Sequence, residues 1–255
     1  MKNVLPILYF VIPCYHDAQT LAVTAPVFLE KLTSLITQEM IRPESRVLFV
    51  NDGSTDGTWE KIVSLHNESA HVVGVDLAWN SGEQNALLAG MQTAAEKADC
   101  IITMDSDLQD DIARADEMLR LFRAGNDVVL GVRSDRRNDL PSERITSAAF
   151  YFTMKLLRTG LVREHSNYRL LSREAVLRVL RAEPPFYLPC LCCNLALPAA
   201  QVAYVREPRA GGVSGYTFRK RLRIGLHAAA AHTAARRFLP PERDPPFEIR
   251  TILDA

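Results

Sequence analysis

Short apolar runs alternate with segments of helical periodicity through the first half of the chain. Between the runs, apolar residues recur at the three- and four-residue spacing of a helix. This alternation predicts an α/β fold in which a mostly parallel sheet is flanked by helices. The runs are rich in β-branched and aromatic residues, as buried strands are, and they span 7–12, 47–50, 72–75, 100–104 and 128–132.

Two of the intervening segments have a clear apolar helix face. The first face consists of Leu21, Ala25, Phe28, Leu32 and Leu35. The second consists of Ala86, Leu87, Gly90, Met91 and Ala94. Residues 81–84 read Ser-Gly-Glu-Gln, which is the spacing of a capping box, so we expect them to open the second helix.

The second half of the chain has a different pattern. It predicts a long helix over 142–161, a shorter helix near 175–180 and an edge strand over 202–205. In the long helix, the residues expected to face inward are Ile145, Ala148, Phe152, Leu156 and Leu157. Paired prolines at 240–241 and 245–246 interrupt regular structure. We therefore expect three parts, which are a domain over 1–216, a basic and alanine-rich helix over 217–238, and a poorly ordered tail over 239–255.

Composition excludes several classes of protein. The chain has 255 residues, 47% of them hydrophobic, with 30 basic side chains against 30 acidic ones. A disordered chain would be poorer in apolar residues, and a general nucleic-acid binder would carry an excess of positive charge. The longest apolar stretch, over 4–14, contains Pro6 and Pro13 and is shorter than the roughly 20 residues of a spanning helix. We expect neither a membrane span nor a signal peptide, and a cytoplasmic location.

The five cysteines agree with a reducing compartment. Their odd number suggests free thiols. Cys190, Cys192 and Cys193 have no second cysteine pair at the spacing of a zinc site. We therefore expect buried small residues at these positions rather than metal ligands.

Polar side chains follow four of the five predicted strands. In open α/β sheets, ligands bind at the carboxyl ends of the strands, so these side chains are expected to converge on one edge. The segments that follow the strands are 13–17, 51–58, 105–111 and Arg133.

Asp105 and Asp107 are the most informative pair. Two carboxylates separated by one residue at the end of a strand can share a divalent cation, and Mg²⁺ and Mn²⁺ favour oxygen ligands together with substrate phosphates. Gln109 lies two residues further on and can supply a neutral oxygen from the same side. The alternative is a solvated acidic turn.

The loop that begins at Asp52 suggests recognition of a nucleotide base. A carboxylate at a strand end can accept a hydrogen bond from a base N–H, and Tyr15 can provide a flat surface for the same base. Asp56 is expected to cap the next helix. The chain has no phosphate-cradling Gly-x-Gly-x-x-Gly or Walker loop, which disfavours ordinary dinucleotide chemistry.

Three segments together resemble the signatures of family 2 glycosyltransferases, which have the GT-A fold. They are 11–15 (VIPCY), 50–58 (VNDGSTDGT) and 104–110 (MDSDLQD). The branch they resemble is that of dolichol-phosphate mannosyltransferases and bacterial polyprenyl-phosphate glycosyltransferases. Shorter matches at 80–82, 131–133 and 168–173 extend the resemblance over 7–226.

The resemblance implies a role for each matching residue. The nucleotide would contact Pro13, Tyr15, Asp17, Val50 and Asp52. The diphosphate and a Mg²⁺ or Mn²⁺ ion would be held by Asp105, Ser106, Asp107 and Gln109, with Asp105, Asp107 and Gln109 as the metal ligands. Arg133 and Arg209 would meet the donor or acceptor phosphates. The catalytic set is Asp107, Asp110 and Arg133.

The sequence departs from the family pattern at a few positions. Asp17 stands where the family usually has Glu, Asn167 where it commonly has Asp, and Gly215 where it usually has Lys. Many members of the family also continue into two membrane helices, which we do not find in this sequence.

These observations predict an inverting transferase that moves a hexose from a UDP- or GDP-linked donor to a polyprenyl phosphate. The runner-up acceptor is a sugar hydroxyl of a cell-surface glycan, which would need a general base, with Asp110 or Asp111 as candidates. A hypothesis of another class is a non-catalytic protein that binds nucleotide sugars. The departures Asn167 and Gly215 favour it, and the intact Asp105 and Asp107 oppose it.

A membrane acceptor would require a surface that reaches the bilayer. Arg219, Lys220, Arg221 and Arg223 form a basic cluster at the start of the predicted helix over 217–238. Each such charge is worth about 1 kcal/mol near an anionic membrane, which predicts reversible peripheral attachment. The alternative is that this helix packs on the domain or forms a contact in a homo-oligomer.

Overall fold

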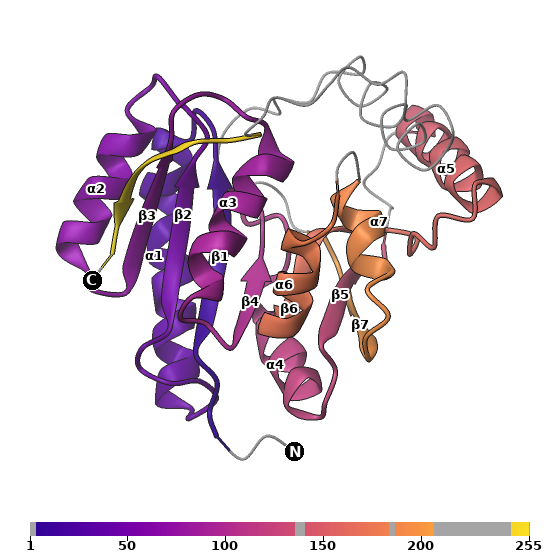
Figure 1. Ribbon diagram of the computed structural model, residues 1–255, viewed down its shortest axis with the longest axis horizontal. Coiled ribbons are helices and arrows are strands. Elements are labelled where there is room, and N and C mark those ends of the chain that lie inside the picture. Colours follow the sequence, from indigo (N-terminus) through magenta and orange to yellow (C-terminus); the bar gives the residue numbers. More distant parts are fainter. Residues whose placement is uncertain (1–3, 136–140, 184–186, 207–245, 255) are drawn as a thin grey trace.

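The chain forms one eight-stranded mixed sheet with helices on both faces (Figure 1). The computed structural model describes residues 4–135, 141–183, 187–206 and 246–254, without the side chains of 141–146 and 166. The strands are β1 (Leu8–Cys14), β2 (Arg46–Asn51), β3 (Val72–Leu77), β4 (Cys100–Thr103), β5 (Val128–Arg133), β6 (His165–Ser172), β7 (Ala199–Tyr204) and β8 (Ile249–Leu253).

The strand order is β7-β5-β6-β4-β1-β2-β3-β8. Four of the neighbouring pairs are parallel, namely β1 with β2, β2 with β3, β1 with β4, and β5 with β7. The antiparallel pairs involve β6, which lies between β4 and β5, and β8, which lies at the edge next to β3. The prediction of a mostly parallel α/β sheet is confirmed, with antiparallel strands inserted in its middle and added at one edge.

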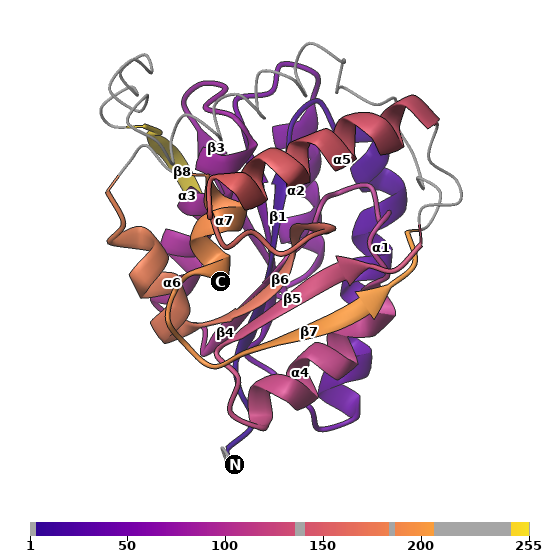
Figure 2. The ribbon, with the colours of Figure 1, turned by 90° about the vertical axis from the view of Figure 1, so that its right-hand side faces the viewer.

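Two layers of helices cover the sheet (Figures 1 and 2). The helices are α1 (Ala18–Thr37), α2 (Thr58–Glu68), α3 (Glu83–Ala95), α4 (Ala115–Arg123), α5 (Pro141–Leu156), α6 (Arg173–Leu180) and α7 (Leu188–Cys193), with a short 3-10 helix η1 (Ile112–Arg114) before α4. One core lies between the sheet and α1, α2 and α4. The other lies between the sheet and α3, α6 and α7.

The alternation of side chains along β1 connects the two cores. Leu8, Phe10 and Ile12 point into the core under α1, whereas Tyr9 and Val11 point into the core under α3. A strand with both faces covered must be apolar at every position, which explains the continuous run in the sequence. The two predicted helix faces are also confirmed, because all ten of their residues are buried in α1 and α3.

Helix α1 is, by length and composition, the one helix of the described residues that could cross a membrane. Its apolar stripe packs on the sheet, with Phe28 in contact with the rings of Phe10 and Phe49. We therefore interpret α1 as a core helix.

Strand β6 was not predicted. Its sequence, HSNYRLLS, carries polar residues that hide the strand pattern. The structure buries several of them, and Arg169 is completely inaccessible to solvent. Because these polar groups form hydrogen bonds inside the protein, their polarity did not indicate exposure.

The inward face predicted for the long helix is wrong. In α5, Phe152 is 70% exposed and Leu156 is 72% exposed. The residues that pack inward are Met154 and Phe150, against Tyr187 and Cys190. Because the helix is apolar on two sides, periodicity alone did not determine which side faces the protein.

The expected tail is also partly wrong. Residues 249–253 form β8, which pairs antiparallel with β3, so the sheet is not confined to residues 1–216. Phe247 and Ile249 pack against the core under α3. The predicted helix over 217–238, with its basic cluster, lies outside the described residues, as do Arg209 and Gly215.

Candidate active site

The carboxyl ends of β1, β2 and β4 lie side by side at one edge of the sheet (Figure 1). Pro13 is aligned with Val50 and Cys14 with Asn51 across the first pair of strands. The loops that follow these strands contain most of the predicted site residues. The expected convergence of segments 13–17, 51–58 and 105–111 is therefore confirmed.

Asp17 links the loop after β1 to the loop after β4. Its Oδ2 accepts hydrogen bonds from the Tyr15 N–H at 3.1 Å and from the Ser106 hydroxyl at 2.9 Å. Burial raises the pKa of Asp17 from its ordinary value. Asp17 and Ser106 thus hold the two loops together, which places Asp105 and Asp107 beside the loop of Tyr15.

Tyr15 offers an exposed aromatic surface at this edge. Its side chain is 46% exposed. The ring stacks on His16, with centroids 4.1 Å apart and planes inclined by 16°. A flat, partly exposed stack of this kind is suited to contact with a nucleotide base.

Asp52 is buried and already has two partners. Its carboxylate accepts hydrogen bonds from the Ser81 N–H at 2.6 Å and from the Gly82 N–H at 3.0 Å. The predicted capping box is therefore wrong. Gly82, with φ of 87°, precedes the first turn of α3 without a side-chain cap, and the Ser81 hydroxyl donates to the Trp79 carbonyl.

The loops of Asp52 and Trp79 approach each other backbone to backbone. A Cβ atom on Gly53 would lie 2.3 Å from the carbonyl carbon of Trp79, and the φ of Gly53 is +63°. Only glycine fits both conditions. Gly53 thus serves the close packing of the two loops, whereas Gly57, with φ of +88°, is the left-handed residue that precedes α2.

Val50 and Asp56 have structural roles that limit what they can bind. The side chain of Val50 is buried in the core under α3, so only its backbone faces the strand ends. Asp56 accepts hydrogen bonds from the Thr58 N–H at 3.2 Å and from the Ala18 N–H at 3.4 Å. The N-cap of α2 is Gly57, so the expected position of the cap is wrong by one residue. The Asp56 carboxylate instead links the first residue of α2 to the start of α1.

Asp105 and Asp107 form a close pair of carboxylates. Burial and the charge of Asp107 raise the pKa of Asp105. Asp107 accepts a hydrogen bond from the Gln109 N–H at 3.1 Å. Two carboxylates that repel each other at a strand end fit a divalent cation, which would relieve the repulsion and take its remaining ligands from phosphates. Within the described ranges no cluster of three or more acidic, His or Cys ligands is formed.

Asn167 binds to Asp105 from β6. Its Nδ2 donates to Asp105 at 3.2 Å and also to Glu83 at the start of α3. Arg169 donates to its Oδ1 at 2.9 Å, which fixes the orientation of the amide. An amide at this position therefore supports Asp105 by donating a hydrogen bond, which an ionised Asp would not do.

Asp110 is the buried carboxylate of the site. Tyr204 donates to its Oδ1 at 2.5 Å, and Arg133 donates to the Tyr204 hydroxyl at 3.3 Å. Burial, together with the charge of Asp105, raises the pKa of Asp110 to about 6. Its Oδ2 has no hydrogen-bond partner in the part of the chain that the structure describes.

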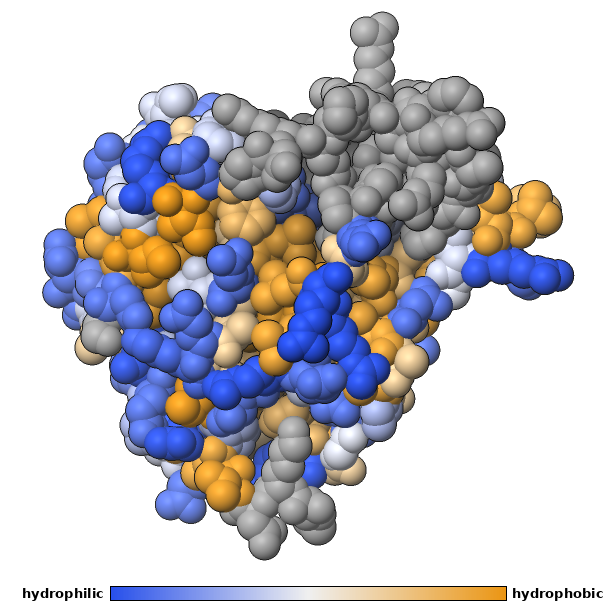
Figure 3. All heavy atoms as spheres, in the orientation of Figure 1, coloured by the Kyte–Doolittle hydropathy of each residue, from blue (hydrophilic) through white to orange (hydrophobic). Residues whose placement is uncertain are grey.

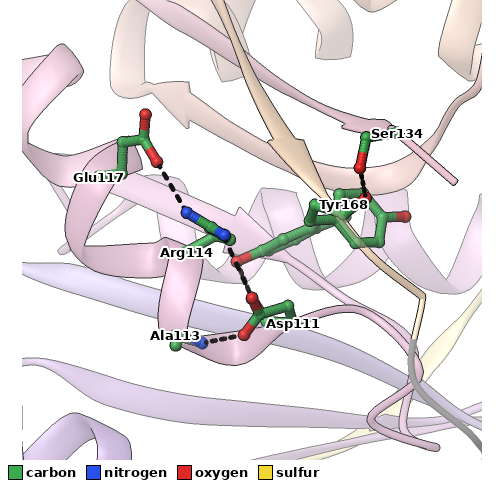
Figure 4. Close-up of polar contacts among 7 residues, drawn as sticks. Asp111, Ala113, Arg114, Glu117, Ser134 and Tyr168 are labelled. Carbon is green, nitrogen blue, oxygen red and sulfur yellow. Dashed lines mark hydrogen bonds and ion pairs between the residues drawn. The ribbon is translucent and has the colours of Figure 1, made fainter.

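Asp111 is engaged in a different way (Figure 4). Its side chain caps η1 by accepting from the Ala113 N–H at 3.0 Å and pairs with Arg114 at 3.2 Å. The Tyr168 hydroxyl donates to its backbone carbonyl at 3.0 Å. Of the two predicted candidate bases, Asp110 therefore has the environment of a functional carboxylate.

Arg206 is a site residue that the sequence analysis missed. It follows β7 and donates to the Oε1 of Gln109, the oxygen predicted to bind metal. Its buried Nε has no partner among the described residues. Burial and the nearby Arg133 lower its pKa. Ligands bind near the residues that follow each strand, and Arg206 follows the edge strand predicted over 202–205. The same reasoning applied to that strand identifies Arg206.

The family of the chain follows from its sequence. The profile of glycosyl transferase family 2 matches residues 9–180. The uncharacterised glycosyltransferase YkoT of Bacillus subtilis is 32% identical over 236 residues, which cover 92% of this chain and 70% of that protein. The chain belongs to glycosyl transferase family 2.

A second relative has a more informative name. The bactoprenol glucosyl transferase of Shigella phage SfV is 31% identical over 208 residues, which cover 81% of this chain and 65% of that protein. The chain thus matches somewhat less than two thirds of the length of that relative.

Solved structures support the GT-A fold. Mannosyl-3-phosphoglycerate synthase from Rubrobacter xylanophilus has a TM-score of 0.55 at 15% identity, covering 91% of this chain and 74% of its own. Glucosyl-3-phosphoglycerate synthase from Mycobacterium tuberculosis, in a complex with Mn²⁺, UDP and glucosyl-3-phosphoglycerate, has a TM-score of 0.52 at 16% identity. That match covers 92% of this chain and 81% of the other. At these identities the likeness concerns the fold.

Proposed function

We propose that this protein transfers a hexose, with inversion, from a nucleoside-diphosphate sugar to a polyprenyl phosphate. The observation that carries the proposal is the convergence of the Asp105–Asp107 pair with the loops of Tyr15 and Asp52 at one edge of the sheet. Tyr15 and Asp52 would contact the base, with Pro13, Asp17 and the backbone of Val50 beside them. The relatives named as bactoprenol glucosyl transferases support this acceptor.

Asp105 and Asp107 would hold a Mg²⁺ or Mn²⁺ ion between them and the diphosphate. The ion would neutralise the charge that develops on the leaving diphosphate. Among the described residues, Arg133 and Arg206 are two cations close to the site, and their guanidinium groups suit phosphate oxygens. Gln109 would position Arg206 through its side-chain oxygen. Arg209 remains a predicted phosphate contact.

A phosphate acceptor needs little help from a base because its oxygen is anionic at neutral pH. The runner-up, transfer to a sugar hydroxyl, has one specific observation in its favour. Asp110 is buried, has a pKa of about 6 and leaves one oxygen without a partner among the described residues. A general base is most effective with a pKa near the working pH.

Helix α5 provides a surface that suits contact with a bilayer. Phe152 and Leu156 project from it with 70% and 72% exposure. Lys155 and Arg158 lie on or just after this helix, and residues 147–163 contain no acidic residue, so the charge there suits anionic lipid, whereas Arg163 is paired with Glu164. Figure 3 shows hydrophobic surface next to strongly polar surface at the end of the molecule where α5 lies in Figure 1. We propose peripheral membrane contact here, in addition to the predicted basic helix over 217–238.

Two measurements test the proposed function. Nucleoside diphosphates should raise the melting temperature in the presence of Mn²⁺, and the base that is recognised should give the largest shift. Sugar from the matching labelled donor should then appear on a short-chain polyprenyl phosphate. Transfer of the sugar to a glycan, and not to the lipid, would support the runner-up. Nucleotide binding with no turnover of any kind would indicate a non-catalytic relative.

A further inference from the structure

The last strand of the chain reaches the loops that would hold the nucleotide base. Strand β8 lies against β3, with Thr251 aligned with Asp76. Figure 1 shows β8 in yellow at the edge of the sheet, beside β3 and far along the sequence from it. The match to the family profile ends at residue 180, so β8 lies outside the part of the chain that the profile covers.

Arg250 of β8 forms an ion pair with Asp76 at the end of β3. Its Nη1 lies 3.1 Å from the Asp76 Oδ2, and its Nη2 donates to the Ala78 carbonyl at 2.9 Å. The side chain of Asp76 is 3% exposed, whereas that of Arg250 is 61% exposed. A buried carboxylate requires partners, and Arg250 supplies one of them from the surface.

The other oxygen of Asp76 determines the orientation of Asn51. The Asn51 Nδ2 donates to the Asp76 Oδ1 at 2.7 Å. The Asn51 Oδ1 therefore faces the loop, where it accepts from the Ser54 N–H at 3.3 Å. The Ser54 hydroxyl in turn accepts from the His16 N–H at 3.0 Å, beside the Tyr15 ring. A chain of hydrogen bonds thus runs from β8 to both loops proposed to hold the base.

A second route leads from β8 to Asp52. The Ala78 N–H donates to the Glu248 carbonyl at 2.9 Å, so both backbone groups of Ala78 are held by the C-terminal segment. Residues 79–82 follow directly, and their backbone contacts Gly53 and donates to the Asp52 carboxylate. The position of Asp52 therefore depends on a segment that β8 fixes at its start.

We propose that β8 supports the nucleotide-binding loops and that Arg250 is a positioning residue for the nucleotide base. This inference rests on the proposed function, because the base site itself is part of that proposal. Arg250 acts through Asp76 and Asn51 on one side and through Ala78 on the other. Its loss would leave Asp76 without its cation and would free the Asn51 amide to turn.

The chain offers a matched control at the C-terminal segment. Lys97 pairs with Asp254 near the end of β8 at 2.5 Å, on the surface and away from the loops. Lys97→Met and Arg250→Met each remove one exposed cation and one ion pair of the C-terminal segment. Only Arg250→Met interrupts the path to Asn51 and Ala78.

The experiment compares wild type, Arg250→Met, Arg250→Lys and Lys97→Met. For each, the dissociation constants of UDP, GDP and pyrophosphate with Mn²⁺ and the kcat and KM for donor are measured. We expect Arg250→Met to weaken binding of the preferred nucleoside diphosphate about two- to fivefold, within the range of a partly exposed charged contact. Pyrophosphate binding and kcat should be unchanged, Arg250→Lys should recover part of the affinity, and Lys97→Met should match wild type.

The outcomes separate the two proposals. Wild-type affinity for the nucleotide in Arg250→Met would overturn the role of Arg250 and leave the proposed function intact. Equal losses for nucleotide and pyrophosphate, or equal losses in both Met variants, would show a general effect on the fold and would also overturn it. Failure of the wild-type protein to bind any nucleoside diphosphate would instead refute the proposed function.

Discussion

The two halves of the strand edge are built in different ways. On the side of β1, β2 and β3, the loops are fixed by their own side chains and backbone, as in the pairs Asn51–Asp76 and Asp52–Ser81. On the side of β5, β6 and β7, charged groups are buried without full pairing, as at Asp110 and Arg206 among the described residues. Rigid loops suit a site that holds the nucleotide of the donor. Incompletely paired charges suit a site where a substrate or an ion supplies the missing partner.

The largest effect is expected where the two halves meet. Asp107→Ala should abolish transfer, because one carboxylate cannot hold the cation against the diphosphate. The substitution should leave the melting temperature without ligand close to that of wild type. Calorimetric titration of Mn²⁺ with nucleoside diphosphate and a transfer assay check this.

Asp111→Ala is the control for Asp107→Ala. It removes an acidic side chain from the same loop and should cost only about 1 kcal/mol of stability through the lost cap. Transfer by Asp107→Ala at the wild-type rate would contradict the role of the carboxylate pair. Transfer by the wild-type protein in an excess of chelator would contradict it as well.

The rigid half is tested by Asp52→Ala. Loss of a charge-assisted hydrogen bond to the base should weaken nucleoside diphosphate binding by about 1.5–3 kcal/mol. Because Asp52 also holds Ser81 and Gly82, binding of pyrophosphate should be measured in parallel. A loss confined to the nucleotide would support base recognition, and an equal loss for pyrophosphate would show that Asp52 is only a clamp between loops.

The incompletely paired half is tested by the pH dependence of stability without metal. The pKa of Asp110 is raised to about 6, so the folded protein binds the proton more tightly than the unfolded chain, whose Asp has a pKa near 3.9. The free energy of unfolding should therefore fall as pH rises from about 4 to about 6, and stay reduced above that range. Asp110→Asn should reduce this dependence, leaving the part that comes from the raised pKa values of Asp17 and Asp105. It should stabilise the protein at pH 8 by on the order of 3 kcal/mol.

Thermal or urea unfolding of both proteins at pH 4 and pH 8 measures the difference. Equal stability of Asp110→Asn and wild type at pH 8 would contradict a raised pKa. Transfer activity of the same variant is informative as well, since retention favours a phosphate acceptor and loss favours a hydroxyl acceptor that needs a base.

The smallest effect concerns the outer surface of α5. Replacement of Phe152 and Leu156 together by Ser should weaken sedimentation with anionic vesicles about tenfold, because the exposed apolar side chains would no longer be buried in the interface. Val23→Ser is the control, since Val23 is 55% exposed on α1. Unchanged sedimentation would exclude α5 as the contact.

The sequence predicted the rigid half well, for a physical reason. There, strands covered on both faces are continuously apolar, and the residues that follow them lie at one edge. The same rule failed at β6, which runs antiparallel, so that its beginning and not its end lies near the site. Asn167 and Arg169 are therefore at the start of a strand, and their buried polarity hid the strand itself.

The C-terminal strand escaped prediction for another reason. Its five residues follow a segment interrupted by prolines, and nothing in the local sequence indicates that β3 needs an antiparallel neighbour. Nothing in the sequence around Asp76 indicates that Arg250 is its partner. Pairings between residues distant in sequence leave little local signal.

The distance along the chain between Asp76 and Arg250 also has a consequence for biosynthesis. Their hydrogen bond joins residues 174 positions apart. At about 5–20 residues per second on the ribosome, β3 would wait on the order of ten seconds or more for its neighbour. During that time its outer edge is an open template for pairing with other nascent chains. Slower translation of the last third of the message should therefore increase the fraction of this protein that aggregates.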